Sequence, residues 1–232
     1  MAKEIEPKFL VDPQRWRPQP NAKPKKIFQN YIDLDAPGQQ VRITEDGKVG
    51  HITFAGPDYA AQFFMPIGMA QEMRQTLLFS DKDKGVLANA GGQNVRIRFT
   101  DQEGKIMKVR WAVKKPTDEP ATKDEFEADV PFTEQLTAYD AGMDVLKHLK
   151  HFGLRKNRFE ERHADGHLWE YDVYQSLDKP LITAEVELQS RDEPYAKPAS
   201  LGREVTGEHG YSNYTLARTG KVPEEKSSVL YL

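Results

Sequence analysis

The chain has 232 residues, 38% hydrophobic and 30% charged, which is enough apolar material to bury the core of one large domain or two small ones. It has no cysteine, which excludes disulfides, thiolate zinc sites and cysteine nucleophiles, and favours hard metals bound by oxygen. Its 33 basic and 36 acidic residues nearly cancel, so composition does not indicate a nucleic-acid partner. The sequence shows neither a membrane span nor a signal peptide, and we expect a cytoplasmic protein.

The first part of the chain predicts mixed elements separated by turn-forming residues. A glycine-rich loop at Asp81–Gln93 lacks the lysine and hydroxyl residue of a phosphate-binding loop. In chain order the expected elements are an opening strand within Met1–Val11, an extended basic connection at Arg15–Lys26, a hairpin within Ile27–Phe54 turning at Asp46–Gly47, and a helix after Pro66 within Tyr59–Phe79.

The second part of the chain predicts strands around one amphipathic helix. Thr133 is the expected N-cap of a helix that runs through Phe152, with Gly153 just past its end. The tail at 218–232 is expected to be loose. The strands are NVRIRF, KIMKVRWAVK and DEFEADVP before the helix, and LRKNRFE, HLWEYDVY and LITAEVELQ after it. Strands with few helices indicate the α+β class.

The charged residues of these strands recur at every second position, so they share one face of each strand. Most strands carry a single sign of charge, whereas solvated faces of sheets mix charged residues with Thr, Ser and Gln. The face holds eight cations (Lys8, Arg96, Arg98, Lys108, Arg110, Lys114, Lys156, Arg158) and nine carboxylates (Glu4, Glu6, Glu125, Glu127, Asp129, Glu170, Asp172, Glu185, Glu187).

Two interpretations of this face remain open. It is the solvated side of ordinary antiparallel sheets, or the sheet closes on itself with the charges inside. Unpaired ions cost several kcal/mol in a dry core, so a closed sheet requires a wet tunnel with a ligand that satisfies both signs. A polyphosphate with divalent cations does so, because basic residues bind phosphate oxygens and carboxylates bind Mg²⁺ or Mn²⁺.

The opening Glu4-Ile5-Glu6-Pro7-Lys8 matches the ExExK signature of the CYTH superfamily, the triphosphate tunnel metalloenzymes. The later segments VRIRF, WAVKK, DEFEADVP, RKNRFE, HLWEYDVY, AEVELQSRDEP and LGREVTGEHGYSNYTLA follow the order of its short bacterial members. The resemblance covers Ala2–Asp12 and Asn94–Ala217. It leaves residues 13–93 as an insertion or remodelled region within a single domain, 1–232.

The resemblance implies an eight-stranded antiparallel β-barrel tunnel with flanking helices and an inserted subregion. It also implies roles for individual residues, with Asp129, Glu170 and Asp172 equally explained as structural ion pairs. The implied metal ligands are Glu4, Glu6, Glu125, Glu127, Glu185 and Glu187, the catalytic residues Glu4, Glu6 and Lys8, and the substrate-binding residues Lys8, Arg96, Arg98, Lys114, Lys156, Arg158 and Arg203. The charged face adds Lys108 and Arg110 to the expected substrate-binding residues.

The implied function is hydrolysis of inorganic tripolyphosphate or a nucleoside triphosphate with Mg²⁺ or Mn²⁺. The alternatives are a class IV-type adenylyl cyclase, a thiamine triphosphatase, a non-catalytic nucleotide or polyphosphate binder, and a scaffold without ligand. We expect a triphosphate-containing small molecule as the partner, no nucleic acid and no membrane, and leave a homodimer open. Base recognition by the extra region would fall to Arg15, Trp16, Phe63 and Phe64.

Overall fold

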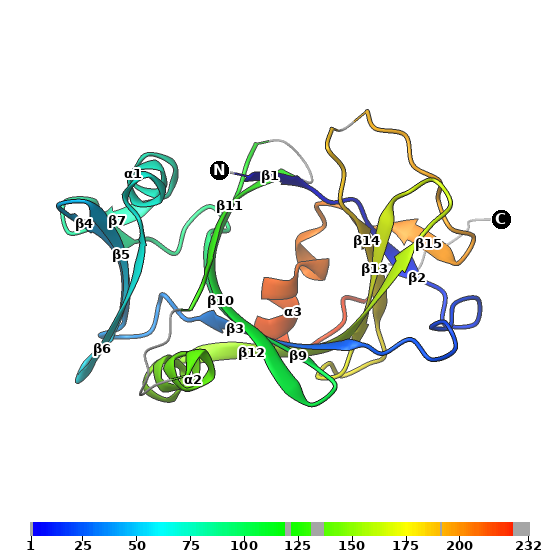
Figure 1. Cartoon of the computed structure of the whole chain (residues 1–232), viewed down its shortest axis with the longest axis horizontal. Helices are drawn as coiled ribbons and strands as arrows, with labels where there is room; N and C mark the ends of the chain where they lie inside the picture. Colours follow the sequence, from blue (N-terminus) through cyan, green and yellow to red (C-terminus); the bar gives the residue numbers. More distant parts are fainter. Residues whose placement is uncertain (1, 119–121, 131–136, 191, 225–232) are drawn as a thin grey trace.

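The computed structural model describes residues 2–118, 122–130, 137–190 and 192–224. The larger of its two antiparallel sheets has ten strands and curves round on itself (Figure 1). These strands are β1 (Ala2–Ile5), β2 (Lys8–Val11), β3 (Lys25–Ile32), β9 (Asn94–Gln102), β10 (Lys105–Pro116), β11 (Thr122–Asp129), β12 (His151–Arg162), β13 (Leu168–Tyr174), β14 (Ile182–Val186) and β15 (Leu201–Glu204).

The order of strands in this large sheet is β1-β11-β10-β9-β3-β12-β13-β14-β2-β15. β1 and β2 are consecutive in the chain, separated only by Glu6 and Pro7, so the ring of strands begins and ends on the same opening segment. Two backbone hydrogen bonds link this segment to the chain at the end of β14, from Val186 N to Pro7 O at 3.4 Å and from Leu188 N to Ile5 O at 3.0 Å. We call these strands, without β15, the ring.

The expected antiparallel, sheet-rich α+β fold is confirmed, but the expected strand count of eight is wrong. The sheet has ten strands, and its hydrogen-bonded order is a series with two ends rather than one unbroken ladder. One reason is Pro7, which has no N–H to donate and separates β1 from β2. Another is β15, which adds to the outer edge of β2.

The second sheet comes from residues 40–87 and has five strands in the order β6-β5-β4-β8-β7. The expected hairpin is confirmed: β4 and β5 pair on either side of a turn in which Gly47 has φ +59°, a conformation that glycine adopts readily. The helix expected after Pro66 is also confirmed. The elements are β4 (Gln40–Asp46), β5 (Val49–Gly56), β6 (Tyr59–Pro66), α1 (Ile67–Thr76), β7 (Phe79–Asp81) and β8 (Val86–Leu87).

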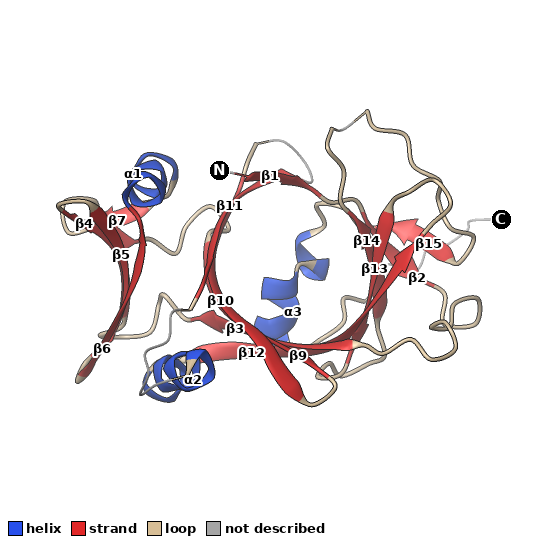
Figure 2. Cartoon of the chain, in the orientation of Figure 1, coloured by secondary structure: helices blue, strands red, loops and turns tan. Residues whose placement is uncertain are grey.

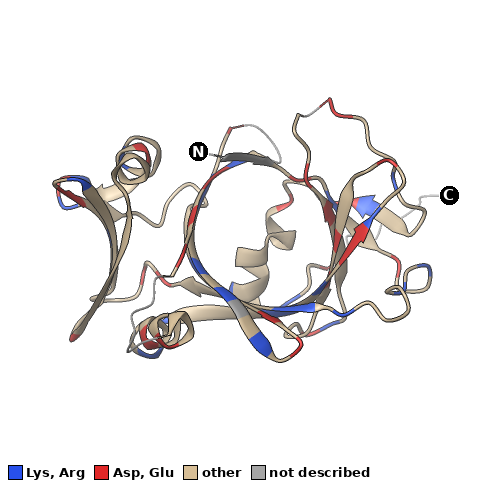
Figure 3. Ribbon diagram, in the orientation of Figure 1, with Lys and Arg blue, Asp and Glu red and all other residues tan. Residues whose placement is uncertain are grey.

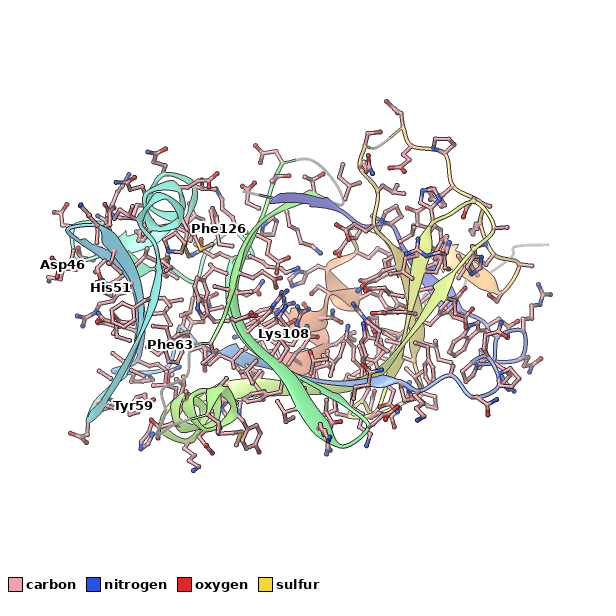
Figure 4. The ribbon with its side chains drawn as sticks, in the orientation of Figure 1. Asp46, His51, Tyr59, Phe63, Lys108 and Phe126 are labelled. Carbon is pink, nitrogen blue, oxygen red and sulfur yellow. The ribbon has the colours of Figure 1, made fainter. Side chains whose placement is uncertain are left out.

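The apolar side chains of β9, β10 and β11 face outward and pack against the second sheet. Ile97 and Trp111, on β9 and β10, are completely buried in one cluster with Ile52 and Phe54 of β5. Figure 4 shows Phe63 and Phe126 in the layer between the two sheets. Trp111 is thus a core residue, and the outward apolar face leaves the opposite, charged face of these strands pointing inward.

The second long helix, α2 (Ala138–His148), is shorter than expected. Its N-cap is Thr137, whose side chain accepts a hydrogen bond from Asp140 N; the expected N-cap Thr133 lies outside the described residues. The expected end at Phe152 is wrong, because Leu149 is extended and His151 begins β12, which pairs with β3. Gly153 therefore lies within a strand.

The short elements η1 (His209–Tyr211) and α3 (Asn213–Thr219) lie across one end of the ring, whereas α1 and α2 lie outside it (Figure 2). The Ser212 side chain caps α3 by accepting a hydrogen bond from Thr215 N. Leu216 of α3 is completely buried in a cluster with Leu154 of β12 and Tyr211 of η1. None of the described helices is long and apolar enough to cross a membrane.

Candidate active site

A cavity of about 190 Å³ lies inside the ring, lined mainly by charged side chains. Figure 3 shows lysines, arginines and carboxylates on the strands that encircle it. The predicted site residues that the structure brings together there are Glu6, Lys8, Arg96, Arg98, Lys114, Glu125, Glu127, Lys156, Arg158 and Glu185.

Antiparallel pairing of β9, β10 and β11 sets opposite charges beside one another on the inner face. Lys114 of β10 lies directly opposite Glu125 of β11, and their Nζ and Oε2 atoms are 2.7 Å apart. Ala112 lies between Arg96 and Glu127 in the register. A small side chain at this point leaves room for Arg96 to donate to Glu125 Oε1 at 3.0 Å.

The arginines of β9 lie close enough to affect each other's charge. Arg98 donates to Glu127 at 3.3 Å. Burial and the neighbouring Arg96 together lower the pKa of Arg98 below its ordinary value, against the effect of Glu127. Arginine still stays protonated at neutral pH, so this side of the cavity holds repelling cations that an anion would stabilise.

Lys8 of β2 and Glu185 of β14 are paired on the opposite side of the cavity. They are cross-strand neighbours, and Lys8 Nζ lies 2.8 Å from Glu185 Oε1. Burial alone would lower the pKa of Lys8, but Glu185 raises it well above its ordinary value. Burial would likewise raise the pKa of Glu185, but Lys8, Lys156 and Arg158 hold it well below.

β12 contributes Lys156 and Arg158, which both contact Asp172 of β13. Arg158 Nε donates to Asp172 Oδ1 at 2.7 Å, and Lys156 contacts the other carboxylate oxygen. Asp172 is completely buried and does not line the cavity. Burial and the nearby Arg158 guanidinium lower the pKa of Lys156 to about 8. A bound anion would therefore stabilise the protonated form of this lysine.

β3 contributes neutral residues to the cavity between the cations of β9 and β12. Gln29 and Tyr31 both line it, and neither was predicted, because β3 lies in the range assigned to the insertion. Their alternation with Phe28 and Asn30 in KIFQNYI is the signal that could have identified them. The other lining residues that were not predicted are Gly92, Asn94, Pro116, Lys123, His209, Ser212, Asn213 and Tyr214.

Some predicted site residues do not line the cavity. Lys108 and Arg110 pair with the exposed Asp129, at 3.6 and 2.9 Å. Arg203 is exposed and pairs with Glu208. The remainder are Glu170, which contacts Arg158; Asp172, buried behind the cavity; and Glu187, which is exposed. The side chain of Glu4 lies outside the described residues.

The residues predicted to recognise a base do not lie at the cavity either. Trp16 is buried and stacks on Tyr171 with ring centroids 4.7 Å apart. The prediction that it stacks on a nucleotide base is therefore wrong, because its ring packs in the core. Phe63 is buried between the sheets, and Phe64 is 62% exposed on the second sheet. Arg15 is exposed and pairs with Asp12.

The carboxylates suit a hard divalent cation in their chemistry, although no group of three or more acidic or histidine side chains among the described residues is arranged to hold a metal ion. The pairing of Lys8 with Glu185 and of Ile5 with Leu188 sets Glu6 opposite Glu187. Two carboxylates directly opposite each other repel. Glu6 has a cation, Lys123, 3.6 Å away. A divalent ion between the two glutamates would relieve this repulsion.

An inorganic triphosphatase from Acetivibrio thermocellus is 29% identical to this chain over 147 residues, which cover 62% of this chain and 79% of the relative. No protein-family model matches the chain.

Two solved structures share 20% and 13% sequence identity with it. The first is an inorganic triphosphatase with a TM-score of 0.45, covering 94% of this chain and 95% of its own. The second is a Hippeastrum protein described as a putative adenylyl cyclase with a dominant triphosphatase activity, with a TM-score of 0.40, covering 82% and 80%.

Proposed function

We propose that this chain belongs to the CYTH superfamily of triphosphate tunnel metalloenzymes and hydrolyses inorganic triphosphate inside the ring. The cavity carries the proposal. Its described lining has seven cations (Lys8, Arg96, Arg98, Lys114, Lys123, Lys156, Arg158) and four carboxylates (Glu6, Glu125, Glu127, Glu185). The excess of cations attracts a polyanion, and the carboxylates leave acceptors for a metal bound with it.

We interpret the ring as a tunnel in which β1 and β2 act together as one opening segment. β1 pairs with β11 at one end of the series of strands, and β2 pairs with β14 at the other. Within this tunnel, residues 1–232 act as one domain, and the range 13–93 supplies both β3 and the second sheet. The second sheet then serves as a cover for the outer face of the tunnel.

The proposed metal is Mg²⁺ or Mn²⁺, held by Glu6 and Glu187 with the carboxylate of Glu4. Bound there, it would polarise phosphate oxygens and offset the negative charge of the substrate. The side chains of Glu125 and Glu185 are only 5% and 9% exposed, and both are already paired with cations. These pairs support a positioning role: Glu125 holds Lys114 and Arg96 in place, and Glu185 holds Lys8.

The basic residues perform the remaining work of positioning and charge stabilisation. Arg98 and Arg158 come from strands on opposite sides of β3, so they bind a polyphosphate from two sides and hold its chain along the cavity. Lys8 stays protonated because Glu185 raises its pKa. Its ammonium stabilises charge that develops on the phosphoryl group during transfer.

An inorganic substrate fits better than a nucleotide. No tryptophan or phenylalanine is present in the described lining of the cavity, and the aromatic residues there are Tyr31 and Tyr214. Their rings pack edge to face at 5.4 Å, a contact that a stacked base would have to break. A substrate recognised only through its phosphates needs no such platform, in agreement with the name of the relative.

The test measures phosphate release from tripolyphosphate, ATP and GTP with Mg²⁺, with Mn²⁺ or with EDTA. We expect release from tripolyphosphate with either metal, less from the nucleotides, and none with EDTA. Arg98→Ala should raise the KM for tripolyphosphate by about tenfold or more, because it removes a charge-assisted contact. The matched control is Arg162→Ala. Arg162 is an exposed arginine at the end of β12 that donates to Gly166 O, so its loss should leave the KM unchanged.

Release that persists in EDTA would refute metal dependence. If no triphosphate releases phosphate but tripolyphosphate binds tightly in calorimetry, the protein is a non-catalytic polyphosphate binder and the proposed hydrolysis is refuted. Cyclic nucleotide among the products from ATP would instead identify a cyclase.

A further inference from the structure

One buried acceptor in the cavity has no partner among the described residues. The side-chain oxygen of Gln29, on β3, makes no hydrogen bond there although the residue is only 2% exposed and lines the cavity. Leaving such a group without a hydrogen bond destabilises the folded protein. Because buried polar groups are nearly always paired, an exception inside a proposed active site calls for a ligand.

The nearest hydrogen-bond donors on the two strands beside Gln29 are already in contact with carboxylates. The register sets Gln29 opposite Arg98 of β9 on one side and Leu154 of β12 on the other. Arg98 donates to Glu127, and the next inward residue of β12, Lys156, contacts Asp172. Gln29 therefore lines the cavity between two sets of cations while its amide oxygen has no hydrogen-bond partner among the described residues.

The chemistry of the substrate limits what can satisfy this oxygen. The outer oxygens of a deprotonated triphosphate are hydrogen-bond acceptors and cannot donate to a carbonyl. Water donates, and hydrolysis requires one water molecule close to the phosphorus under attack. The need of Gln29 for a donor and the need of the reaction for an oriented water are complementary.

We propose that Gln29 Oε1 accepts a hydrogen bond from the attacking water and orients its lone pair toward the terminal phosphorus. This inference rests on the proposed hydrolysis. An amide oxygen is too weak a base to remove a proton, so Gln29 holds the water without deprotonating it. Orientation of a nucleophile within contact distance contributes to rate without altering substrate affinity.

In this step the water oxygen forms a bond to the terminal phosphorus. The bond from that phosphorus to the bridging oxygen breaks, and its electron pair leaves with pyrophosphate. Both hydrogens of the water depart with the new phosphate as dihydrogen phosphate, which returns one proton to solvent at neutral pH. Atoms and charge balance without any further reactant.

The test compares Gln29→Leu, which removes the acceptor at similar volume, with Gln29→Glu, which keeps an oxygen in the same place. We expect Gln29→Leu to lower kcat for tripolyphosphate by about 100-fold with KM within about twofold of the wild type. Gln29→Glu should keep kcat within about tenfold, with a raised KM because a carboxylate repels the substrate. Gln62→Leu, on the second sheet, is the matched control and should behave as wild type.

Three results would overturn the assignment. The first is wild-type kcat in Gln29→Leu. The second is a raised KM at unchanged kcat in that variant, which would assign the amide N–H to a phosphate oxygen. The third is an equal loss of kcat in both variants, which would show that the shape of the glutamine side chain matters and its acceptor oxygen does not. A wild-type enzyme inactive on every triphosphate would instead refute the proposed function, and thermal denaturation checks that each variant is folded.

Discussion

The two sheets use the same alternation of apolar and polar residues in opposite senses. In the second sheet, Ile52 faces the core and its neighbour Thr53 faces outward, as in an ordinary antiparallel sheet with one solvated face. In the ring, Ile97 faces outward into the core and Arg98 faces the cavity. The ring can hold charges inside only because another layer covers its apolar outside, and the second sheet is part of that layer.

This comparison also changes how the inserted region is understood. Deleting residues 13–93 would remove β3 from the ring and expose Trp111 and its neighbours, which the second sheet buries. Such a deletion would test folding rather than substrate preference. Point substitutions within each sheet separate the two contributions.

The largest expected effect comes from charging the buried face of the second sheet. Ile52→Lys places an ammonium in a completely buried position and should lower the free energy of unfolding by about 4 kcal/mol or more, or prevent folding. The adjacent Thr53→Lys should change it by less than about 0.5 kcal/mol. Urea denaturation of the two variants gives the comparison, and equal losses would contradict the assignment of the two faces.

The ring should respond in the opposite way when its inner charges are removed. Glu6→Gln and Glu187→Gln should each lower kcat for tripolyphosphate by at least about 100-fold, because each removes a proposed metal ligand, while the folded structure is kept. Glu103→Gln, in the exposed turn between β9 and β10, should have wild-type kcat. A metal titration shows whether the loss is recovered at high Mg²⁺, and full activity of both ligand variants at low Mg²⁺ would eliminate them as ligands.

The pH dependence of substrate binding should separate two lysines of the ring. Lys156, whose pKa is lowered to about 8, is charged below that pH and neutral above it, so the KM for tripolyphosphate should rise by about tenfold per pH unit above pH 8. Lys8, whose pKa Glu185 raises, stays protonated near pH 8 and should add no change of slope to the plot of KM against pH there. Lys156→Arg should abolish the rise, and an unchanged break in that variant would assign it to another group.

The smallest effect concerns Trp16, for which the sequence indicated stacking on a base. Trp16→Phe should leave the ratio of kcat/KM for ATP and tripolyphosphate unchanged, because the indole packs on Tyr171 and Phe159 instead of lining the cavity. The substitution should lower stability by about 1 kcal/mol. A selective loss of ATP hydrolysis would restore a role for Trp16 in nucleotide recognition.

Much of the ring could be predicted because each strand carries its own pattern. The alternation in NVRIRF and DEFEADVP determines which residues share a face, so Arg96, Arg98 and Glu127 could be grouped from their spacing alone. The same spacing did not decide whether that face points to solvent or to a cavity. The resemblance to a tunnel family supported the second choice, which the cavity inside the ring agrees with.

The parts that could not be predicted depend on contacts between distant segments. Gln29 and Tyr31 are neutral and carry no recognisable motif, so only the pairing of β3 with β9 and β12 shows that they enter the cavity. The same pairing ends α2 early, because His151 joins β3 rather than continuing the helix. Trp16 illustrates the reverse error: a basic, proline-rich segment indicated a surface position, whereas Tyr171 and Phe159 provide a buried aromatic site for it.

The most direct test of the central claim is a crystal structure of the protein with tripolyphosphate and Ca²⁺. We expect the phosphate chain inside the ring, in contact with Arg98 and Arg158, and the cation beside Glu6. Tripolyphosphate bound only on the outer surface, with the cavity occupied by its own ion pairs, would contradict the account.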